Sequence, residues 1–525
     1  MSQKEIINNG LKYSLNEDEK TATIFGYDNP AHEVLVPRSI IYNSNEYSVI
    51  SIFDEAFKRS PIRTLKFDPK TELQFIGKHI FAYSPIECVF LPSNIKEIKS
   101  GFCKETYRFK KIEIIRNGAE NIKFIDDKIL VGKSDVTSDI FDVVLFARRD
   151  IEEVVISPEI KRIGAHSFEH CRKIKSITIP DNSELQYIDE FSFYDSSIDH
   201  MSIPSSIVEI KEDWCCGLIN LNELKILPRK EVNVQWIDDS ILIGKSDVKS
   251  DIFDLLIFAR RNIEEVTIPA QIRRISSYSF DCCGLKKVEF QEDSQLQSIG
   301  IHGFASSAIE SIKIPSQVTI IEDGAFCWCQ QLLHVEFSMN SNIQTIEEGA
   351  FHGSVLESLS IPSNILNLKD GWCSELFNLK IVNVMQNGDE NIRYVDDKIL
   401  IGKSDAKSDV FDVVLFGRRD IEEVVISPQI KKIAANSFEH CFVLKRITIP
   451  ENSELQILGS FAFSGSAIEN LFIPQKMVQM DENALSYCDK LKLIEVANEE
   501  IFHKYENNVF NECVNAHVLF PSYKK

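Results

Sequence analysis

A short strand-like segment recurs along almost the whole of this sequence, and it constrains the fold more than any other feature. The segment reads apolar-x-x-apolar-x-apolar and often ends in proline, as in LKKVEF, IESIKIP and LKRITIP. Successive copies lie 22 to 24 residues apart, except for three steps of 42 residues. The fourth residues of the copies are Leu65, Val89, Ile112, Val154, Ile177, Met201, Leu224, Val266, Val288, Ile312, Val335, Leu359, Val382, Val424, Ile447, Leu471, Ile494 and Val518. A repeat of this length indicates a solenoid in which each copy forms one coil.

A second marker lies between the strands, where a small residue is followed by an aromatic residue. These aromatic residues are Phe57, Phe81, Phe102, Phe168, Phe193, Trp214, Phe280, Phe304, Phe326, Phe351, Trp372, Phe438 and Phe463. A unit of about 23 residues cannot bury its own apolar face, but coils stacked about 4.8 Å apart place each apolar side chain on its counterpart in the next coil. We therefore predict one solenoid with an aromatic spine, and not three or four globular domains of about 150 residues each.

Each of the three long steps contains the same insertion, which we call an island. The first island contains NIKFIDDKILVGKSD and runs on to RRDIEEV, and related copies begin at Asn233 and Asn391. The islands therefore lie near residues 121–150, 233–262 and 391–420.

The repeat resembles the BspA-like class of leucine-rich repeats, whose consensus is close to AFxxCxxLxxIxIPxxVxxIxxxAF. Residues 325–351, AFCWCQQLLHVEFSMNSNIQTIEEGAF, match it except that Phe337 and Ser338 replace Ile-Pro. The resemblance extends from about residue 34 to 520 and includes islands built around an Asp-Asp-x-Ile-Leu hairpin. It implies a leucine-rich-repeat solenoid with one curved parallel β-sheet, short helical or irregular convex segments and a single elongated right-handed superhelix. Relatives in trichomonads, entamoebae and oral bacteria are described as surface antigens or adhesins, so it also implies a role of that kind.

Three parts of the chain are expected. Residues 1–34 read as an N-terminal cap hairpin with its turn at 16–20, which covers the first exposed edge of the stack. Residues 35–520 hold the repeats, and residues 521–525 form a C-terminal tail.

The charge and the hydropathy of the sequence limit where the protein can be located and which partners it can bind. The 79 acidic and 58 basic residues give a net charge of -21, which repels nucleic acid and anionic lipid surfaces. No apolar run approaches the roughly 18 residues of a membrane-spanning helix, and neither a signal peptide nor a glycosylation sequon is visible. The sequence therefore indicates a cytoplasmic protein without membrane insertion, whereas the family resemblance implies a cell-surface or secreted one.

The thirteen cysteines follow the repeat. Six lie three residues after the spine aromatic or its equivalent, and three lie one residue after it in the coil that precedes an island. These are Cys171, Cys283, Cys329, Cys441, Cys488 and Cys513, and then Cys103, Cys215 and Cys373. We expect them to stack as buried thiols, a role that requires no oxidation. Pairs such as Cys327 with Cys329 have no second pair at tetrahedral spacing, and His170 and His440 point to separate coils, so neither a metal nor a cofactor is expected.

Two island motifs invite comparison with ligand-binding loops. Gly-Lys-Ser-Asp begins at Gly132, Gly244 and Gly402, but a phosphate-binding loop needs a glycine where each island has an aspartate. Three aspartates follow in each island with D-x3-D-x2-D spacing, which is not that of an EF-hand. We expect them to form turns, with calcium binding left open. They are Asp135, Asp139 and Asp142, Asp247, Asp251 and Asp254, and Asp405, Asp409 and Asp412.

A pair of arginines closes each island. We expect these arginines to pair with the Glu-Glu that follows two residues later or with the island carboxylates. An alternative is a regularly spaced docking surface for a repeating protein partner, in which case reversing all six charges is expected to abolish binding and to leave the fold intact. The six candidate binding residues are Arg148, Arg149, Arg260, Arg261, Arg418 and Arg419.

Alternate residues of the strands must face outward. Serine and threonine dominate this face, with His334, Glu336, Arg446 and Phe472 as further candidate binding residues, and no basic or aromatic stripe marks a nucleic-acid track. No catalytic signature such as a GxSxG elbow occurs. We expect a monomeric, non-enzymatic protein-interaction module, either a surface antigen or adhesin that binds host or matrix proteins or an intracellular scaffold. An enzyme with its site in an island is the alternative of another class.

Overall fold

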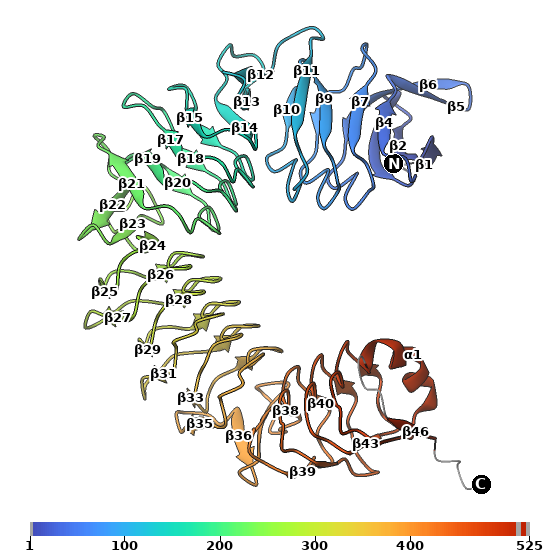
Figure 1. Ribbon diagram of the computed structural model, residues 1–525, viewed down its shortest axis with the longest axis vertical. Coiled ribbons are helices and arrows are strands. Elements are labelled where there is room, and N and C mark those ends of the chain that lie inside the picture. Colours follow the sequence, from blue (N-terminus) through green and yellow to red (C-terminus); the bar gives the residue numbers. More distant parts are fainter. Residues whose placement is uncertain (1–3, 511–515, 521–525) are drawn as a thin grey trace. The chain divides into compact units, whose positions relative to one another are not determined.

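The chain forms two compact units, residues 1–251 and 252–525. The computed structural model describes residues 4–510 and 516–520 of it, and Figure 1 gives the order of the elements. Both units are stacks of coils, and most coils carry one longer strand and one strand of two residues, each paired in parallel with its counterpart in the next coil. The leucine-rich-repeat solenoid is therefore confirmed in each unit.

Unit 1 begins with antiparallel strands. The hairpin expected at the N-terminus is formed by β2 and β3, and its turn is held by the Asn16 side chain, which accepts hydrogen bonds from the backbone N–H groups of Asp18 and Glu19. Strand β3 then pairs in parallel with β6, so this hairpin covers the edge of the first coil. The strands are β1 (Lys4–Asn8), β2 (Leu11–Asn16), β3 (Thr21–Tyr27), β5 (Ser39–Tyr42) and β6 (Asn45–Ile52).

The longer strands of unit 1 form two parallel ladders. Their central residues are buried and stack from coil to coil, as Leu65 on Val89 and Val89 on Ile112. The first ladder contains β4 (Glu33–Val36), β7 (Thr64–Phe67), β9 (Cys88–Pro92) and β11 (Lys111–Ile115). The second contains β15 (Glu153–Val155), β17 (Ser176–Thr178), β19 (His200–Pro204) and β21 (Glu223–Leu227).

Unit 2 repeats this arrangement. One ladder contains β25 (Glu265–Ile268), β27 (Lys287–Phe290), β29 (Ser311–Ile314), β31 (His334–Phe337), β33 (Ser358–Pro362) and β35 (Val382–Met385). The other contains β39 (Glu423–Val425), β41 (Arg446–Thr448), β43 (Asn470–Ile473), β45 (Leu493–Val496) and β46 (His517–Leu519). Helix α1 (Glu499–Val509), capped by the Asn498 side chain, precedes β46.

The expectation of one parallel sheet is incomplete, because the two-residue strands build further parallel ladders. In unit 2, Ile275, Ile299, Ile321 and Ile346 stack on one another through these strands and are buried. In unit 1 the short strands are β8 (Phe75–Ile76), β10 (Glu97–Ile98), β16 (Arg162–Ile163), β18 (Tyr187–Ile188) and β20 (Glu209–Ile210). In unit 2 they are β26 (Arg274–Ile275), β28 (Ser298–Ile299), β30 (Ile320–Ile321), β32 (Thr345–Ile346), β34 (Asn367–Leu368), β40 (Lys432–Ile433), β42 (Ile457–Leu458) and β44 (Gln479–Met480).

Each island contains an antiparallel hairpin. In the first and third islands a further antiparallel strand, β14 or β38, follows the hairpin and then pairs in parallel with the next short strand. The inserted residues thus leave the stack and return to it. The hairpin strands are β12 (Ile122–Ile125) and β13 (Ile129–Gly132), β22 (Val234–Ile237) and β23 (Ile241–Gly244), and β36 (Ile392–Val395) and β37 (Ile399–Gly402), and the returning strands are β14 (Val143–Ala147), β24 (Leu255–Ala259) and β38 (Val413–Gly417).

The aromatic spine is confirmed. In unit 2 the ring centroids of Phe280 and Phe304 lie 4.7 Å apart, those of Phe304 and Phe326 5.3 Å, and those of Phe326 and Phe351 5.6 Å, with nearly parallel planes. Backbone hydrogen bonds tie these turns together as well, since the N–H groups of Phe280, Phe304 and Phe326 each donate to a carbonyl of the next coil, as from Phe280 to Gly303. These turns are irregular, and α1 is the one α-helix in the described part of the chain.

Most of the described cysteines are buried beside this spine, as expected. Cys329, for example, donates from its thiol to the Phe304 carbonyl at 3.1 Å. Burial raises the pKa of Cys103 and of Cys373 to about 12, so these thiols are protonated and unreactive at neutral pH. Cys282 is exposed, and Cys513, like the tail at 521–525, lies outside the described residues.

Candidate protein-binding surfaces

The outward face of β25 to β35 in unit 2 carries two of the predicted binding residues. His334 and Glu336 are exposed on β31, and alternate residues of the neighbouring strands β27 and β29 are exposed with them. His334 is hydrogen-bonded through Nδ1 to the Ser358 hydroxyl on β33 at 2.9 Å. The face is therefore polar and laterally connected between coils.

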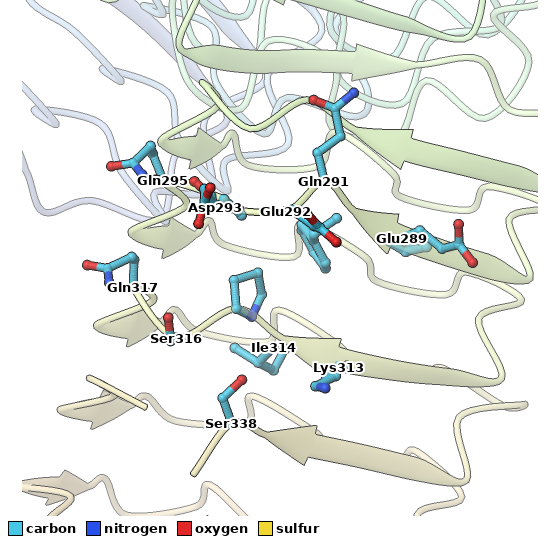
Figure 2. Close-up of a pocket in the computed structure, with 14 residues that line it drawn as sticks. Glu289, Gln291, Glu292, Asp293, Gln295, Lys313, Ile314, Ser316, Gln317 and Ser338 are labelled. Atoms are coloured by element: carbon cyan, nitrogen blue, oxygen red, sulfur yellow. Dashed lines mark hydrogen bonds between the residues drawn. The ribbon is translucent and has the colours of Figure 1, made fainter. Parts of the chain in front are cut away.

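A pocket of about 590 Å³ lies where β27 and β29 end (Figure 2). Figure 2 shows Glu289 and Lys313 on the strands, whereas Glu292 and Asp293 come from the loop that follows β27. Ligand pockets for small molecules are mostly apolar and enclosed, with few polar groups. This open, carboxylate-rich hollow is better suited to polar side chains of a protein.

The other two strand-face residues belong to a different ladder. Arg446 lies on β41, where its guanidinium pairs with the Glu423 carboxylate at 2.6 Å, and Phe472 lies on β43 opposite Glu495 of β45. His334 and Glu336 therefore lie together on one strand, and Arg446 and Phe472 lie in another ladder. The four predicted residues do not belong to one sheet.

The first arginine of the pair has acidic neighbours in the first and third islands. Arg418 donates to the carboxylates of Asp397 at 2.6 Å and Asp420 at 2.9 Å, and Arg148 makes the same contacts with Asp127 and Asp150. Hydrogen bonds from Arg418 lower the pKa of Asp420 below its ordinary value. The expected pairing with island carboxylates is therefore present, whereas docking through these side chains stays a prediction.

The second arginine of each pair is placed differently. Arg261 and Arg419 are 7% and 8% exposed, and each donates to a backbone carbonyl, Ser279 or Ser437, at 2.8 Å. Arg149 lies over the Phe146 ring, with its guanidinium near two thiols. Reversing all six charges is thus not a test of binding alone, because a carboxylate in place of Arg261 or Arg419 would face carbonyl oxygens inside the protein.

The third aspartate of the island triad holds a turn. Asp412 is 2% exposed, and its carboxylate accepts hydrogen bonds from the backbone N–H and the hydroxyl of Ser404, both at 2.9 Å, and from Lys431 at 3.1 Å. Asp142 accepts the same two bonds from Ser134. Burial raises the pKa of Asp412, but these donors outweigh it and lower the pKa below the ordinary value. The expected turn role is present in both islands.

Replacing Asp412 with asparagine is expected to lower the free energy of unfolding by about 1–3 kcal/mol at pH 7, because charge-assisted hydrogen bonds are lost in a buried turn. A lowered pKa stabilises the folded state at neutral pH, and this contribution disappears as the pH falls through the folded pKa. The difference between the proteins in urea unfolding should therefore shrink on acidification. Asp409→Asn, at an exposed position of the same island, is the control, and an equal loss there would contradict this role.

One cluster was missed by reasoning from the sequence. Glu105, Glu169 and His170 offer three ligand atoms that all lie within 4.8 Å of one another in unit 1. Glu105 precedes the first island and the other two follow it, so sequence distance hides their proximity. The sequence does contain one feature that could have indicated this cluster. The same residue types recur around the third island, as Glu375, Glu439 and His440.

The repeats of this chain match a known family of repeat proteins. A family model described as BspA type leucine rich repeat region (6 copies) matches residues 38–135, 140–250, 252–380 and 412–524. No curated protein matches the chain. In the described residues, no helix has the length and apolar character needed to cross a membrane.

Several solved structures are similar. A leucine rich cell surface protein from Faecalibacterium prausnitzii A2-165 is 20% identical over 74% of this chain and 96% of that chain, with a TM-score of 0.45. The pneumococcal vaccine antigen PcpA is 14% identical over 99% of each chain, with a TM-score of 0.32. A leucine-rich repeat protein from Bacteroides ovatus ATCC 8483 is 15% identical over 98% of this chain and 100% of that chain, with a TM-score of 0.28.

Proposed function

Because this chain belongs to the BspA-type leucine-rich repeat family, we propose that it is a non-enzymatic module that binds an extended protein along the outward face of its longer strands. The observation that carries the proposal is the ladder β25 to β35, in which alternate side chains of β25, β29 and β31 are exposed while those between them are buried. Exposed side chains repeated at the strand spacing of about 4.8 Å suit a partner that is itself extended.

The chemistry of this face supports a protein partner. It combines the carboxylates of Glu289 and Glu336 with the amine of Lys313 and the imidazole of His334, and the polar pocket of Figure 2 adjoins it. Such mixed charges favour complementary polar side chains. The net charge of -21 argues against nucleic acid and also against self-association, so we propose a monomer.

We further propose a surface antigen or adhesin that binds host or matrix proteins, the role that the family resemblance implies. An intracellular scaffold is the second candidate, and the observation that favours it is the set of buried reduced thiols such as Cys103, Cys171, Cys373 and Cys441. Surface labelling of intact cells separates the two, because an adhesin must be accessible from outside and a scaffold must not.

The binding face can be tested by charge reversal. The double variant Glu289→Lys and Glu336→Lys is expected to weaken binding of the partner at least tenfold, because complementary charges across an interface become like charges. The immobilised full chain is used to purify the partner from extracts of its source cells, and the dissociation constant is then measured for the wild type and the variant.

A matched control is available in unit 2. Glu348→Lys and Glu482→Lys change the net charge by the same amount at exposed positions in the turns that follow the short strands β32 and β44. This control should bind like the wild type. Equal weakening by both variants would mean that only net charge matters, and full binding by the face variant would refute the proposed surface.

A further inference from the structure

The cluster of Glu105, Glu169 and His170 in unit 1 contains a buried imidazole nitrogen without a hydrogen-bond partner. Glu169 is 0% exposed, and His170 is 8% exposed. Nε2 of His170 makes no hydrogen bond, and Oε1 of Glu169 lies 3.9 Å from it and 3.2 Å from Nδ1 of the buried His166. Leaving this imidazole nitrogen unsatisfied in the interior is costly, and the carboxylate oxygen beside it points to a ligand that can bind both.

The surrounding contacts prepare His170 to bind a metal ion. Its Nδ1 lies 2.7 Å from a carboxylate oxygen of Asp195. A carboxylate accepts hydrogen bonds, so Nδ1 carries the proton of the neutral imidazole, whose lone pair is then at Nε2. A carboxylate that orients a histidine in this way is the usual outer partner of a metal-binding imidazole.

The two carboxylates are held from the other side of the island. The other carboxylate oxygen of Glu169 accepts a hydrogen bond from the backbone N–H of Glu105 at 3.0 Å. The Glu105 side chain is half-buried and is held by the Tyr107 hydroxyl, while the exposed Tyr107 ring covers His170 with a centroid distance of 4.4 Å. The cluster therefore lies close under the surface, with a carboxylate oxygen of Glu105 within 4.8 Å of the other two ligand atoms.

Distances and charges agree with a divalent cation. Zinc binds imidazole nitrogen and carboxylate oxygen at about 2.0–2.2 Å, so one ion can bridge atoms 3.9 Å apart. Arg149 is the cation that faces Glu169, and Arg172 pairs with Asp195. The imidazole of His166, whose Nδ1 lies 3.2 Å from Oε1 of Glu169, adds a nitrogen beside the same carboxylate.

We propose that Glu105, Glu169 and His170 bind one divalent transition-metal ion of the zinc class, which joins the coils on the two sides of the first island. The sequence predicted no metal centre, because it placed His170 in a separate coil. The proposal does not depend on the protein-binding face, which lies in unit 2.

The third island supplies a natural comparison within the same chain. There Glu375 donates its N–H to Glu439 at 2.9 Å, and His440 lies 3.7 Å from that carboxylate, as in the first island. However, the side chain of Glu375 faces His352, and Gly465 stands where Asp195 orients His170. No carboxylate at this position orients His440, so we expect zinc to bind at the first island only.

The test uses the full-length, untagged protein after dialysis against a chelator. Isothermal titration with Zn²⁺ is expected to show one ion per chain, and zinc should raise the midpoint of thermal unfolding. His170→Gln should weaken binding at least tenfold and remove the thermal shift. Asp195→Asn should weaken binding about tenfold through the lost orientation. His440→Gln is the control and should bind like the wild type.

Cobalt identifies the ligands, because Co²⁺ bound by nitrogen and oxygen lacks the strong near-ultraviolet bands of thiolate coordination. The far-ultraviolet circular dichroism of metal-free His170→Gln should equal that of the wild type, which shows that a loss of zinc binding is not a loss of fold. Glu169→Gln provides a second variant for the same test. Absence of stoichiometric binding, undiminished binding by both variants, an equal loss in His440→Gln, or thiolate bands with Co²⁺ would each overturn the proposal.

Discussion

Replacing Arg419 with alanine is expected to lower the free energy of unfolding by about 2–4 kcal/mol, because a buried cation and its charge-assisted hydrogen bonds to carbonyl groups are lost. Its guanidinium donates to the carbonyls of Ser437 and Asn436 and lies 4.6 Å from the centroid of the Phe416 ring. The variant loses these bonds and the packing of the side chain, and it leaves carbonyl oxygens unsatisfied. Urea unfolding followed by circular dichroism measures the change.

The neighbouring arginine is a matched control. The Arg418 side chain is 22% exposed and donates to two exposed carboxylates, Asp397 and Asp420. Ion pairs of this kind contribute about 0–1 kcal/mol, so Arg418→Ala should barely move the urea midpoint. Similar losses in the two variants would show that the backbone contacts of Arg419 do not have the importance assigned to them.

A comparable loss, about 3–5 kcal/mol, is expected when Phe304 is replaced by alanine. This ring is fully buried and stacks between Phe280 and Phe326, so the variant creates a cavity and breaks two aromatic contacts at once. Because coils contact only their neighbours, the loss should be concentrated in the coils around Phe304. Hydrogen exchange resolved along the chain measures this.

An exposed aromatic residue in the same unit serves for comparison. Phe442 is 62% exposed, so truncating it to alanine should change the free energy of unfolding by less than about 1 kcal/mol. If Phe304→Ala were equally mild, or if exchange rose uniformly over unit 2, the aromatic spine would not be the element that holds neighbouring coils together.

The longer strands and the spine could be predicted because each imposes a period on the sequence. Ile177 and Val335 occur at the expected step in an alternating pattern, and both are buried at the centre of a strand. The two-residue strands could not be found in this way. A pair such as Arg162–Ile163 is too short to show alternation, and its pairing follows only from the stacking of the coils around it.

Other features were hidden by composition and by sequence distance. From the sequence, two adjacent arginines are both expected at the surface. The residue types do not show that Arg418 is partly exposed whereas the buried Arg419 points inward to carbonyl groups. Glu105 and Glu169 are separated by the whole first island, so their contact depends on where the island leaves and re-enters the stack. Contacts of this kind depend on the path of the chain in space, and a local sequence pattern does not reveal that path.

The way the islands rejoin the coils bears on how such a protein evolves. In the first and third islands the returning strand, β14 or β38, pairs with the short strand of the coil that follows the island, so each of these islands begins a new ladder. The turn that joins the two hairpin strands lies outside this pairing, so we expect changes in that turn to leave the following coils in place. Natural variation in surface shape can accumulate there while selection on the interior stays unchanged.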